Sequence, residues 1–549
     1  QREMNLLGSL LRWGPAPEEA RVHTCVKRVC VVGAGAAGLI ATKALRESNE
    51  WEVVTYEGSD RIGGMWGWRA DAAVETPYLL ARHYESLTSN LSSVVMSLSD
   101  FPMSPAKYKR ALIAHEDIQE YLESYASHFD LMQSVRLQHR VERVQPRDGG
   151  SWSVRVATDS GEYVEEPFDA VVVCNGHYGQ PFSPVFPGLD TFTGEIGHSQ
   201  DYFTVDHPGK RMGSLRGKRV LVVGCGPSGG ELAAEISTVA AATVISTRRG
   251  FFPIPKIDPK SGAPWDFHRT RFDSLLPTWL SSYLGKKYVF GPLIRGMRKM
   301  GVAAPDDAVL DNMKNATITV TQTLWKQLKS GAVVSNVGGV QKVDATTVTF
   351  ADGQTFDADV ILMCTGYERT CSFFDEQEVD GSIDATTSSD LPVPVVRNRM
   401  RVDPLHDQVF FCNNPTLSFV GNPAKVFIFP MCEVQAQWVR AFLAGECTLP
   451  TPEAMLARRR KQLHTMCAGS PELQLALAKS PNVSHFSYCD AIAKKIGWYP
   501  SLLRHWSVAK HLLFGPFSAA SYRLNSAKSA SDYGELCRRI RSYCTDKFR

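Results

Sequence analysis

The sequence predicts an α/β protein built on two Rossmann-like dinucleotide-binding domains, with a helical insertion and a helical C-terminal region. Two glycine-rich fingerprints carry this prediction, Gly33-Ala34-Gly35-Ala36-Ala37-Gly38 and Gly224-Cys225-Gly226-Pro227-Ser228-Gly229. Each follows a short apolar run, residues 27–32 and 218–223, that is typical of a buried parallel strand. Each also opens a helix-like stretch, which completes the strand–turn–helix context that the fingerprint requires.

The glycines predict a diphosphate site in each unit. A glycine turn lets the backbone approach a pyrophosphate closely, and the helix N-terminus behind it favours negative charge. Two such sites imply two redox nucleotides in one chain, with electrons passed between them. The residues assigned to these turns are Gly33, Gly35 and Gly38 in the first unit and Gly224, Gly226, Ser228 and Gly229 in the second.

The residue that follows the second strand of each unit distinguishes the two nucleotides. Glu57 stands 24 positions after Gly33, where an acidic side chain accepts hydrogen bonds from ribose hydroxyls. The same offset from Gly224 leads to Arg248, with Arg249 beside it. A carboxylate repels a ribose 2′-phosphate, whereas guanidinium groups pair with it. The first site therefore suits FAD, and the second suits NADPH over NADH.

The order of the units predicts an FAD domain that the NADPH domain interrupts. Residues 170–173 and 360–363 are apolar strands; Asn175-Gly176-His177 after the first marks a crossing between domains, and Cys364-Thr365-Gly366 after the second marks a return to the flavin. The expected divisions are an N-terminal extension (1–24), the first segment of the FAD-binding domain (25–214), an NADPH-binding domain (215–331) with an insertion at about 252–312, the second segment of the FAD-binding domain (332–449) and a C-terminal helical region (450–549).

Composition limits the classes of function. A chain of 549 residues is long enough for two or three domains, and a formal net charge of +3 gives no sign of nucleic-acid binding. The 13 cysteines are odd in number and include no Cys-x-x-Cys pair, which argues against a disulfide scaffold or a metal site and for a reducing compartment. No apolar run reaches the roughly 18 residues that span a bilayer.

A basic and apolar segment, residues 274–305, lies inside the insertion. It contains no Asp or Glu, which suits either a membrane-surface segment or a substrate-tunnel cap. A packed helical insertion with a basic rim explains the composition equally well. Residues 4–13 of the N-terminal extension are also spaced to give one apolar helical face. The basic residues of the segment are Lys286, Lys287, Arg295, Arg298 and Lys299.

A third motif, Phe192-x-Gly194-xxx-His198-xxx-Tyr202, lies between the two fingerprints, and with it the chain resembles the flavin-containing monooxygenases, the animal-type members in particular. The resemblance runs from about residue 28 to 525. It includes segments 57–66, 86–90, 99–102, 124–131, 364–367 and 514–518. Two departures are Gln437, where many members carry Arg, and Gly229-Gly230 in place of a Ser/Ala-rich turn.

The resemblance implies a reaction in which NADPH reduces FAD and reduced FAD forms a C4a-hydroperoxide with O₂. A soft nucleophile, an amine nitrogen or a sulfide sulfur, then takes the distal oxygen. By this resemblance, Asn90 corresponds to the active-site Asn of the family. An amide side chain suits that role because it can donate and accept hydrogen bonds without titrating. Trp66 and His198 are further catalytic candidates; Trp66 is expected beside the flavin, and His198 to orient the linker between domains rather than act as a base. Gly64, Trp66, Gly366 and Gln435 complete the expected cofactor-binding set.

Three rival functions compete with this one. A disulfide reductase would need a redox cysteine pair soon after Glu57, and no cysteine lies between Cys30 and Cys174. Baeyer–Villiger oxygenation of carbonyls is disfavoured by Tyr202-Phe203, where that group usually has Trp-Pro. A largely uncoupled NADPH oxidase or NADPH-sensing protein is the third alternative.

The expected location and partners follow from the same resemblance and composition. We expect an intracellular protein, cytosolic or peripheral on the cytoplasmic face of the endoplasmic reticulum membrane. Its expected partners are a small nucleophilic substrate and O₂, with no nucleic acid. A peripheral membrane contact and a homodimer are hypotheses.

Overall fold

The computed structural model describes most of the chain. The described residues are 19–20, 26–48, 50–67, 84–104, 107–108, 111–206, 212–299, 302, 318–374, 387–397, 401–423, 426–467, 484–526, 531 and 533–538. The apolar face expected over residues 4–13 lies outside them. Within them, the predicted α/β class is confirmed, because two mainly parallel sheets carry the two glycine fingerprints.

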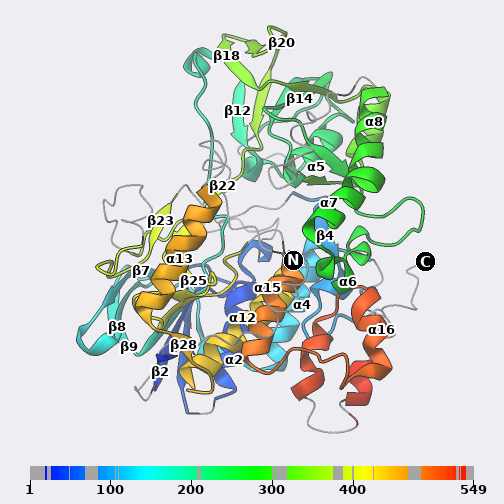
Figure 1. The fold of residues 1–549 in the computed structure, drawn as a ribbon. Coiled ribbons are helices and arrows are strands. Elements are labelled where there is room, and N and C mark those ends of the chain that lie inside the picture. The colour runs from blue at the N-terminus through cyan, green and yellow to red at the C-terminus, as the bar shows by residue number, and fades with distance from the viewer. Residues whose placement is uncertain are drawn as a thin grey trace.

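A seven-stranded sheet, the first sheet, forms the base of the lower body in Figure 1. Its strands pair in parallel from β27 to β6, and the two remaining edge strands are antiparallel. The central strand β2 aligns Val29 with Val53 on one side and with Ala170 on the other, so its buried apolar residues continue across the sheet. In spatial order the strands are β25 (Leu405–His406), β26 (Phe410–Phe411), β27 (Leu417–Phe419), β10 (Ala170–Val173), β2 (Arg28–Val32), β3 (Glu52–Tyr56) and β6 (Val135–Arg136).

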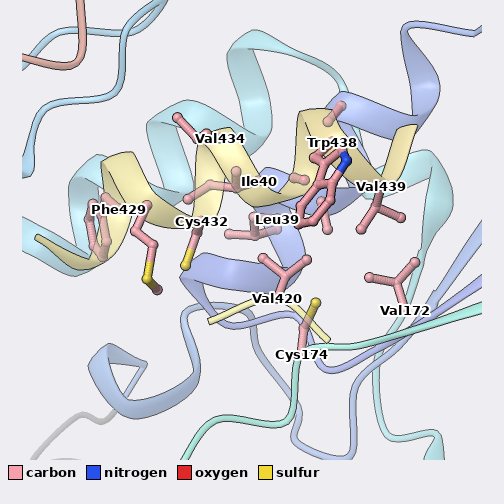
Figure 2. Packing of buried hydrophobic residues seen from close by; sticks show 14 of the residues in the cluster. Leu39, Ile40, Val172, Cys174, Val420, Phe429, Cys432, Val434, Trp438 and Val439 are labelled. Carbon is pink, nitrogen blue, oxygen red and sulfur yellow. The ribbon is translucent and has the colours of Figure 1, made fainter. Parts of the chain in front are cut away.

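Two helices pack together over this sheet and build its core. They are α2 (Ala36–Arg46), which follows the first fingerprint, and α12 (Ile428–Leu443), and Figure 2 shows their apolar side chains meeting above the strands. Trp438 of α12 is fully buried and packs edge-on against Phe410 of β26, with ring centroids 4.8 Å apart. This packing fixes the N-terminus of α2 relative to the carboxyl ends of β2 and β10.

A five-stranded sheet, the second sheet, is parallel throughout and lies in the upper body of Figure 1. The helix α5 (Pro227–Ile236) follows the second fingerprint, and the strands in spatial order are β12 (Glu195–His198), β21 (Val360–Met363), β13 (Arg219–Val223), β14 (Ala242–Thr247) and β17 (Val334–Val337). All five lie, along the chain, between the N-terminal and the C-terminal strands of the first sheet, so the expected interruption of one domain by the other is observed.

Three of these strands correct the expected domain limits. β12 precedes residue 215, and β17 and β21 follow residue 331, yet all three pair within the second sheet. The fingerprint identifies only the local unit β13–α5–β14, whereas tertiary pairing decides which distant apolar strands flank it. We therefore propose that the second domain extends from about 195 to 363. The chain returns to the first domain just after β21, through β22 (Tyr367–Glu368), which pairs with β11 (Gln180–Pro181).

The insertion is helical, as expected, and it contacts both domains. It contains β15 (Phe252–Ile254), the short turn η6 (Trp265–His268), α6 (Arg271–Leu275), α7 (Thr278–Gly285), the π-helical turn η7 (Lys286–Phe290) and α8 (Gly291–Lys299), and β15 pairs with β16 (Ile318–Val320) at its end. Arg271 of α6 is buried and forms an ion pair with Asp490 of α15 at 2.8 Å, so the insertion also reaches the C-terminal region.

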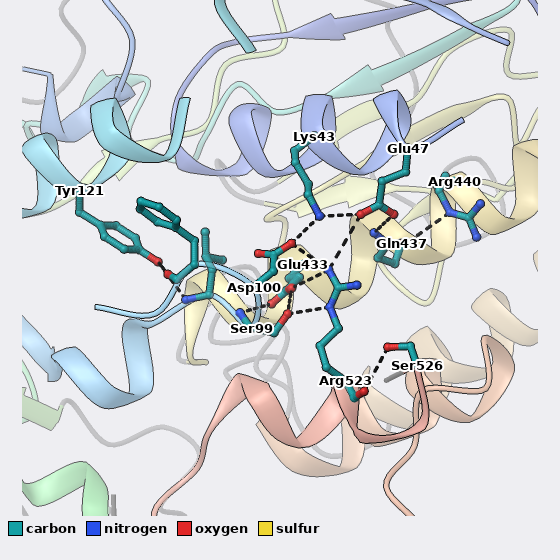
Figure 3. Close-up of polar contacts among 12 residues, drawn as sticks. Lys43, Glu47, Ser99, Asp100, Tyr121, Glu433, Gln437, Arg440, Arg523 and Ser526 are labelled. Atoms are coloured by element: carbon teal, nitrogen blue, oxygen red, sulfur yellow. Dashed lines mark hydrogen bonds and ion pairs between the residues drawn. The ribbon is translucent and has the colours of Figure 1, made fainter. Parts of the chain in front are cut away.

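The C-terminal region is helical in its described residues, and an ionic network ties it to α2. Figure 3 shows Arg523 between Ser99, Asp100 and Glu433. Lys43 of α2 contacts Asp100, and burial together with the nearby Asp100 raises the pKa of Glu433. The elements of this region are α13 (Pro452–Cys467), α15 (His485–Lys495), α16 (Trp506–Phe514) and η9 (Ala519–Ser526).

The remaining elements flank the two sheets. The three-stranded sheet β7 (Arg140–Pro146), β8 (Trp152–Ala157) and β9 (Tyr163–Phe168) belongs to the lower body, and β18 (Val340–Asp344), β19 (Thr347–Phe350) and β20 (Thr355–Asp357) to the upper one. The others are β1 (Glu19–Ala20) with β28 (Leu449–Pro450), β4 (Thr88–Ser92) with β5 (Leu112–Ala114), β23 (Val395–Arg397) with β24 (Arg401–Asp403), α3 (Ser93–Met96), α4 (His115–His128), α10 (Leu324–Ser330) and the turns η1 (Gly64–Trp66), η2 (Leu131–Ser134), η3 (Asp148–Gly150), η4 (Leu189–Thr191) and η5 (Ser199–Asp201).

Candidate functional site

The first glycine turn is shaped by two close backbone approaches. Gly33 has φ +99°, and a Cβ atom there would lie 2.9 Å from the carbonyl oxygen of Cys174, at the end of β10. A Cβ atom on Gly38 would lie 1.8 Å from the carbonyl oxygen of Gly33. Only glycine fits at either position. The turn therefore lies directly on the carboxyl ends of the central strands, where nucleotides bind in sheets of this type.

The second glycine turn repeats the first. Gly224 has φ +97°, and its Cβ atom would lie 2.6 Å from the carbonyl oxygen of Cys364, which follows β21 as Cys174 follows β10. A Cβ atom on Gly229 would lie 2.2 Å from the carbonyl oxygen of Gly224. The additional Gly230 also has a reason, because its Cβ atom would lie 2.5 Å from a methyl carbon of Thr319 on β16.

The helix N-terminus behind each turn carries no side chain that would compete with an anion. Gly35 and Gly226 are the N-cap residues of α2 and α5; neither helix has a capping side chain or an acidic residue in its first turn. A Cβ atom on Gly226 would meet nothing within 4 Å, and Ser228 is exposed one residue inside α5. The backbone N–H groups and the positive end of each helix dipole thus fit a diphosphate.

Glu57 lies against the first glycine turn and keeps free hydrogen-bond acceptor sites. One carboxylate oxygen accepts a hydrogen bond from the Ala34 N–H at 2.7 Å, and the other accepts from the N–H and hydroxyl of Ser59. A carboxylate offers about four lone-pair sites, so it can still accept from ribose hydroxyls. The position expected from the spacing is therefore one that fits the ribose of a dinucleotide.

The segment that contains Trp66 packs onto the same turn. The Gly63 N–H donates to the carbonyl of Ala34, and Gly63 pairs with Gly35 in an isolated parallel β-bridge. A Cβ atom on Gly64, which has φ +57°, would lie 2.9 Å from the Cα of Gly35. Trp66 is half-buried against the core of the first domain. The structure thus brings the first glycine turn, Glu57, Gly64 and Trp66 together as one site.

Arg248 and Arg249 lie on the carboxyl edge of the second sheet. Both are exposed and directly follow β14, whose Ser246 carbonyl accepts from the Gly224 N–H at 2.8 Å. Gly339 has φ +80° and lies against the side chain of Arg248. Two guanidinium groups one strand away from the glycine turn fit the 2′-phosphate of NADPH.

His198 holds the hinge between the two domains. Its Nδ1 accepts from the Gln200 N–H at 3.2 Å, and its Nε2 donates to the carbonyl of Gly366 at 3.0 Å. Burial lowers the pKa of His198, so the ring is neutral with both nitrogens engaged. This geometry supports the linker role over general-base catalysis. The Gly366 carbonyl also accepts from Phe182, so Gly366 serves the hinge rather than reaching a cofactor through that carbonyl.

Gln435 likewise acts through its neighbours. It is fully buried on α12, its amide oxygen accepts from the Gly421 N–H at 2.8 Å, and its amide nitrogen donates to the Tyr488 hydroxyl at 2.7 Å. Both ends of the amide are satisfied by protein groups. Gln435 therefore positions the turn that follows β27, and its direct contact with a cofactor stays a prediction.

Asn90 lies on β4, at an irregularity in the pairing with β5. The two strands align at Thr88 with Ala114 and at Ser92 with Leu112, and the register shifts between these pairs. Such a bulge redirects side chains and often lies beside an active site. Asn90 is exposed and has no hydrogen-bond partner among the residues that the structure describes. Its amide is therefore available to a ligand.

A buried cation, which sequence reasoning missed, fastens β4 to the second domain. The Lys256 side chain is 1% exposed and forms an ion pair with Glu231 of α5 at 2.5 Å. Its ammonium group also donates to the Thr88 carbonyl at 3.1 Å and to the Thr88 hydroxyl at 2.8 Å. Tyr84 donates a further hydrogen bond to Glu231. The strand that carries Asn90 is thus bound to the helix that follows the second fingerprint.

A second missed group, Asp266 of η6, holds the other end of β4. One of its carboxylate oxygens accepts from the Ser92 N–H at 2.7 Å, and the other is buried without a hydrogen-bond partner among the described residues. Burial raises the pKa of Asp266 to about 6. Lys256 and Asp266 together clamp β4 on both sides of Asn90.

The third motif also connects the two domains. The Tyr202 hydroxyl donates to Glu235 of α5 at 2.9 Å, and the Phe203 carbonyl accepts from the Glu85 N–H just before β4. His198 holds the hinge at the other end of the motif. The motif therefore links the hinge, α5 and the approach to β4 in one short run of chain.

The described residues offer no metal centre and no disulfide. No group of three or more potential metal ligands occurs among them. Ten of the cysteines are free thiols, and burial raises the pKa of Cys225 and Cys364.

This geometry defines a class: an α/β oxidoreductase with a dinucleotide site on each of two sheets and a hinge between them. A family model described as flavin-binding monooxygenase-like matches residues 26–530, and the chain belongs to that family. FAD and NADPH, the cofactors predicted from the two fingerprints, are the cofactors of this family.

Similar proteins span nearly the whole chain. Dimethylaniline monooxygenase (N-oxide-forming) 2 of Rattus norvegicus is 32% identical over 518 residues, covering 91% of this chain and 89% of the relative. A 4-hydroxybenzoate brominase (decarboxylating) of Marinomonas mediterranea is 27% identical over 529 residues, covering 92% and 91%. The solved S-allyl-L-cysteine S-oxygenase of Allium sativum shares the fold with a TM-score of 0.62 at 24% identity, covering 94% and 98%.

Proposed function

We propose that this flavin monooxygenase uses NADPH and O₂ to oxygenate a soft nucleophile, an amine nitrogen or a sulfide sulfur. Bound FAD, reduced by NADPH, supplies the activated oxygen. The protein's role is then to bind both nucleotides, orient the nucleophile and exclude water. The N-oxide-forming relative at 32% identity supports nitrogen as the acceptor. Sulfur is included because sulfides are soft nucleophiles of the same kind.

The observation that carries this proposal is the placement of Asn90. It is an exposed amide without a partner among the described residues, on a first-domain strand that Lys256 and Asp266 of the insertion hold. Lys256 is paired with Glu231, and His198 uses both ring nitrogens, so neither of these groups offers a free base. Oxygen transfer to a soft nucleophile requires no protein base, whereas an amide can position the reacting groups.

We assign Asn90 to the oxygenation site and Trp66 to the neighbourhood of the flavin. His198, Gly366 and Gln435 are positioning residues. Tyr202-Phe203 stands where Baeyer–Villiger enzymes usually have Trp-Pro, and this favours the proposal over Baeyer–Villiger oxygenation. For cofactor binding we retain Gly33, Gly35, Gly38, Glu57 and Gly64 for FAD, and Gly224, Gly226, Ser228, Gly229, Arg248 and Arg249 for NADPH.

The proposal is tested by measuring NADPH consumption, product and H₂O₂ together. The purified holoenzyme is screened with tertiary amines, sulfides, cyclic ketones, and 4-hydroxybenzoate with bromide. We expect N-oxide or sulfoxide in near-stoichiometric ratio to NADPH. Lactone from the ketones, brominated phenol, or H₂O₂ alone under every condition would each replace the proposed function with a different one.

We propose further that the insertion contacts an anionic membrane surface. In the described residues, no helix is both long and apolar enough to cross a membrane. Nevertheless, Trp279 on α7 is 71% exposed and Tyr288 of η7 is 64% exposed, with the exposed Lys287 beside Tyr288. Exposed aromatic and basic side chains on one segment favour binding at an interface. The segment is also partly packed, since Ile294 and Met297 of α8 are buried, so a tunnel cap is the alternative.

A further inference from the structure

Arg369 is a buried cation at the point where the chain returns to the first domain. It directly follows β22 and is 5% exposed. One terminal nitrogen donates to the side-chain oxygen of Asn422, and the other donates to the Asn422 carbonyl at 3.2 Å and to Nδ1 of His177 at 2.8 Å. All of these acceptors are neutral. Its Nε is buried without a hydrogen-bond partner, and among the described residues Arg369 forms no ion pair with a carboxylate.

The contact with Arg369 fixes the state of His177. A guanidinium can only donate, so Nδ1 of His177 is an acceptor and its proton lies on Nε2. Burial and the charge of Arg369 lower the pKa of His177 to about 3. The ring is therefore neutral at physiological pH and cannot serve as a base. It keeps an Nε2–H donor, polarised by the guanidinium behind it.

The pair lies beside the first glycine turn. Arg369 lines a small hollow with Asn175, Gly176, Gly421 and Asn422, at the carboxyl ends of β10 and β27. A Cβ atom on Gly33 would lie 3.6 Å from the Cα of Asn175. On the other side, a Cβ atom on Gly421 would lie 3.3 Å from the Cβ of Ala37, in the first turn of α2. The hollow thus adjoins the fingerprint from two directions.

A buried charge without a counter-ion is costly in free energy, and burial lowers the pKa of Arg369 accordingly. A ligand that brings negative charge to this place removes that cost. We propose that Arg369, with His177 as a second donor, forms an anion site for the diphosphate of FAD. This site complements the N-terminus of α2 at the same carboxyl edge of the first sheet. The inference depends on flavin binding at the first turn and is independent of which nucleophile is oxygenated.

The test compares FAD with riboflavin, which lacks the diphosphate, in the wild type and in Arg369→Met, Arg369→Lys and Arg216→Met. Arg216 is an exposed arginine paired with Asp206, and its variant is the control for loss of one surface charge. FAD release from the holoenzyme and rebinding to the apoprotein are followed by flavin fluorescence. We expect Arg369→Met to weaken FAD binding at least tenfold, Arg369→Lys to weaken it less, and riboflavin binding to stay the same in all variants.

Thermal unfolding supplies a second readout, in which Arg369→Met should stabilise the apoprotein although it weakens FAD binding. If the charge of Arg369 is neutralised only when FAD binds, Arg369→Met should raise the unfolding midpoint of the apoprotein. The same variant should show a smaller increase in unfolding midpoint when FAD is added. A purely structural arginine would lower the apoprotein midpoint and leave the ratio of FAD to riboflavin affinity unchanged, which overturns the proposal. A shift in the flavin midpoint potential with unchanged FAD affinity overturns it too, because the charge would then face the flavin ring.

Discussion

Replacing Arg248 and Arg249 with Ala should convert a strong preference for NADPH into a weak one. Both side chains are exposed after β14, one strand from Gly224, so the 2′-phosphate is the group that they can pair with. NADH lacks that phosphate. The double variant should therefore lose affinity for NADPH, whereas its affinity for NADH should stay close to that of the wild type.

The magnitude follows from the number and the exposure of the bonds. A hydrogen bond to a charged group contributes about 1.5–3 kcal/mol. Two exposed arginines, discounted for solvent screening, give about 2–4 kcal/mol together, or roughly 30- to 1,000-fold in dissociation constant. Arg248 should carry the larger share, because Gly339 packs against its stem and restrains it, whereas no such contact holds Arg249 among the described residues. Arg248→Lys should fall between the wild type and Arg248→Ala, since lysine keeps the charge but not the paired geometry.

The measurement is anaerobic flavin reduction over a range of NADPH and NADH concentrations, which gives a dissociation constant for each nucleotide. Arg216→Met, remote from β14 in sequence and paired at the surface, controls for net charge. Equal losses of affinity for NADPH and NADH would refute the reasoning, because the arginines would then bind a group that both nucleotides contain.

Three other variants test the remaining features of the site. Asn90→Ala should leave FAD binding and flavin reduction intact while product per NADPH falls and H₂O₂ rises; wild-type coupling would make Asn90 structural. Because the folded-state pKa of Asp266 is about 6, above its ordinary value of 3.8, its contribution to stability is lost as pH rises between these values. Asp266→Asn should therefore gain up to ~3 kcal/mol on the wild type between pH 4 and pH 7, seen in unfolding midpoints, and an equal difference at both pH values would contradict this. Lys286→Glu with Lys287→Glu should reduce co-sedimentation with anionic vesicles, as should added NaCl; a wild-type protein that stays in the supernatant at low salt would leave the segment as a tunnel cap.

The glycine turns can be predicted from sequence because their constraints are local. Gly33 and Gly224 meet the carbonyl oxygens of Cys174 and Cys364 in the same way, and nothing but a short strand–turn–helix pattern is needed to recognise that geometry. Sheet membership is harder to predict. β21 is an uninterrupted apolar run that fits either sheet, and only its pairing with β12 and β13 assigns it to the second.

The clamp on β4 could not be predicted, because its partners are far apart along the chain. Lys256 meets Thr88 across 168 positions, and Asp266 meets Ser92 across 174. A lysine or aspartate in a basic insertion also looks like a surface residue. The one available signal was Lys256 directly after the apolar run 251–255, which is an unusual place for a solvated charge. The linker role proposed for His198 could be inferred from the sequence only because the third motif contains this residue.

The clamp fastens the strand that carries Asn90 to the second domain. Strand β4 belongs by chain order to the first domain, but Lys256, Tyr84 and Asp266 join it to α5 and η6. Any displacement of the second sheet relative to the first would therefore be transmitted to β4. We therefore expect a displacement of the second domain to change the surroundings of Asn90 together with the second nucleotide site. A substitution that loosens the hinge should appear first as leakage of H₂O₂, before the rate of flavin reduction changes.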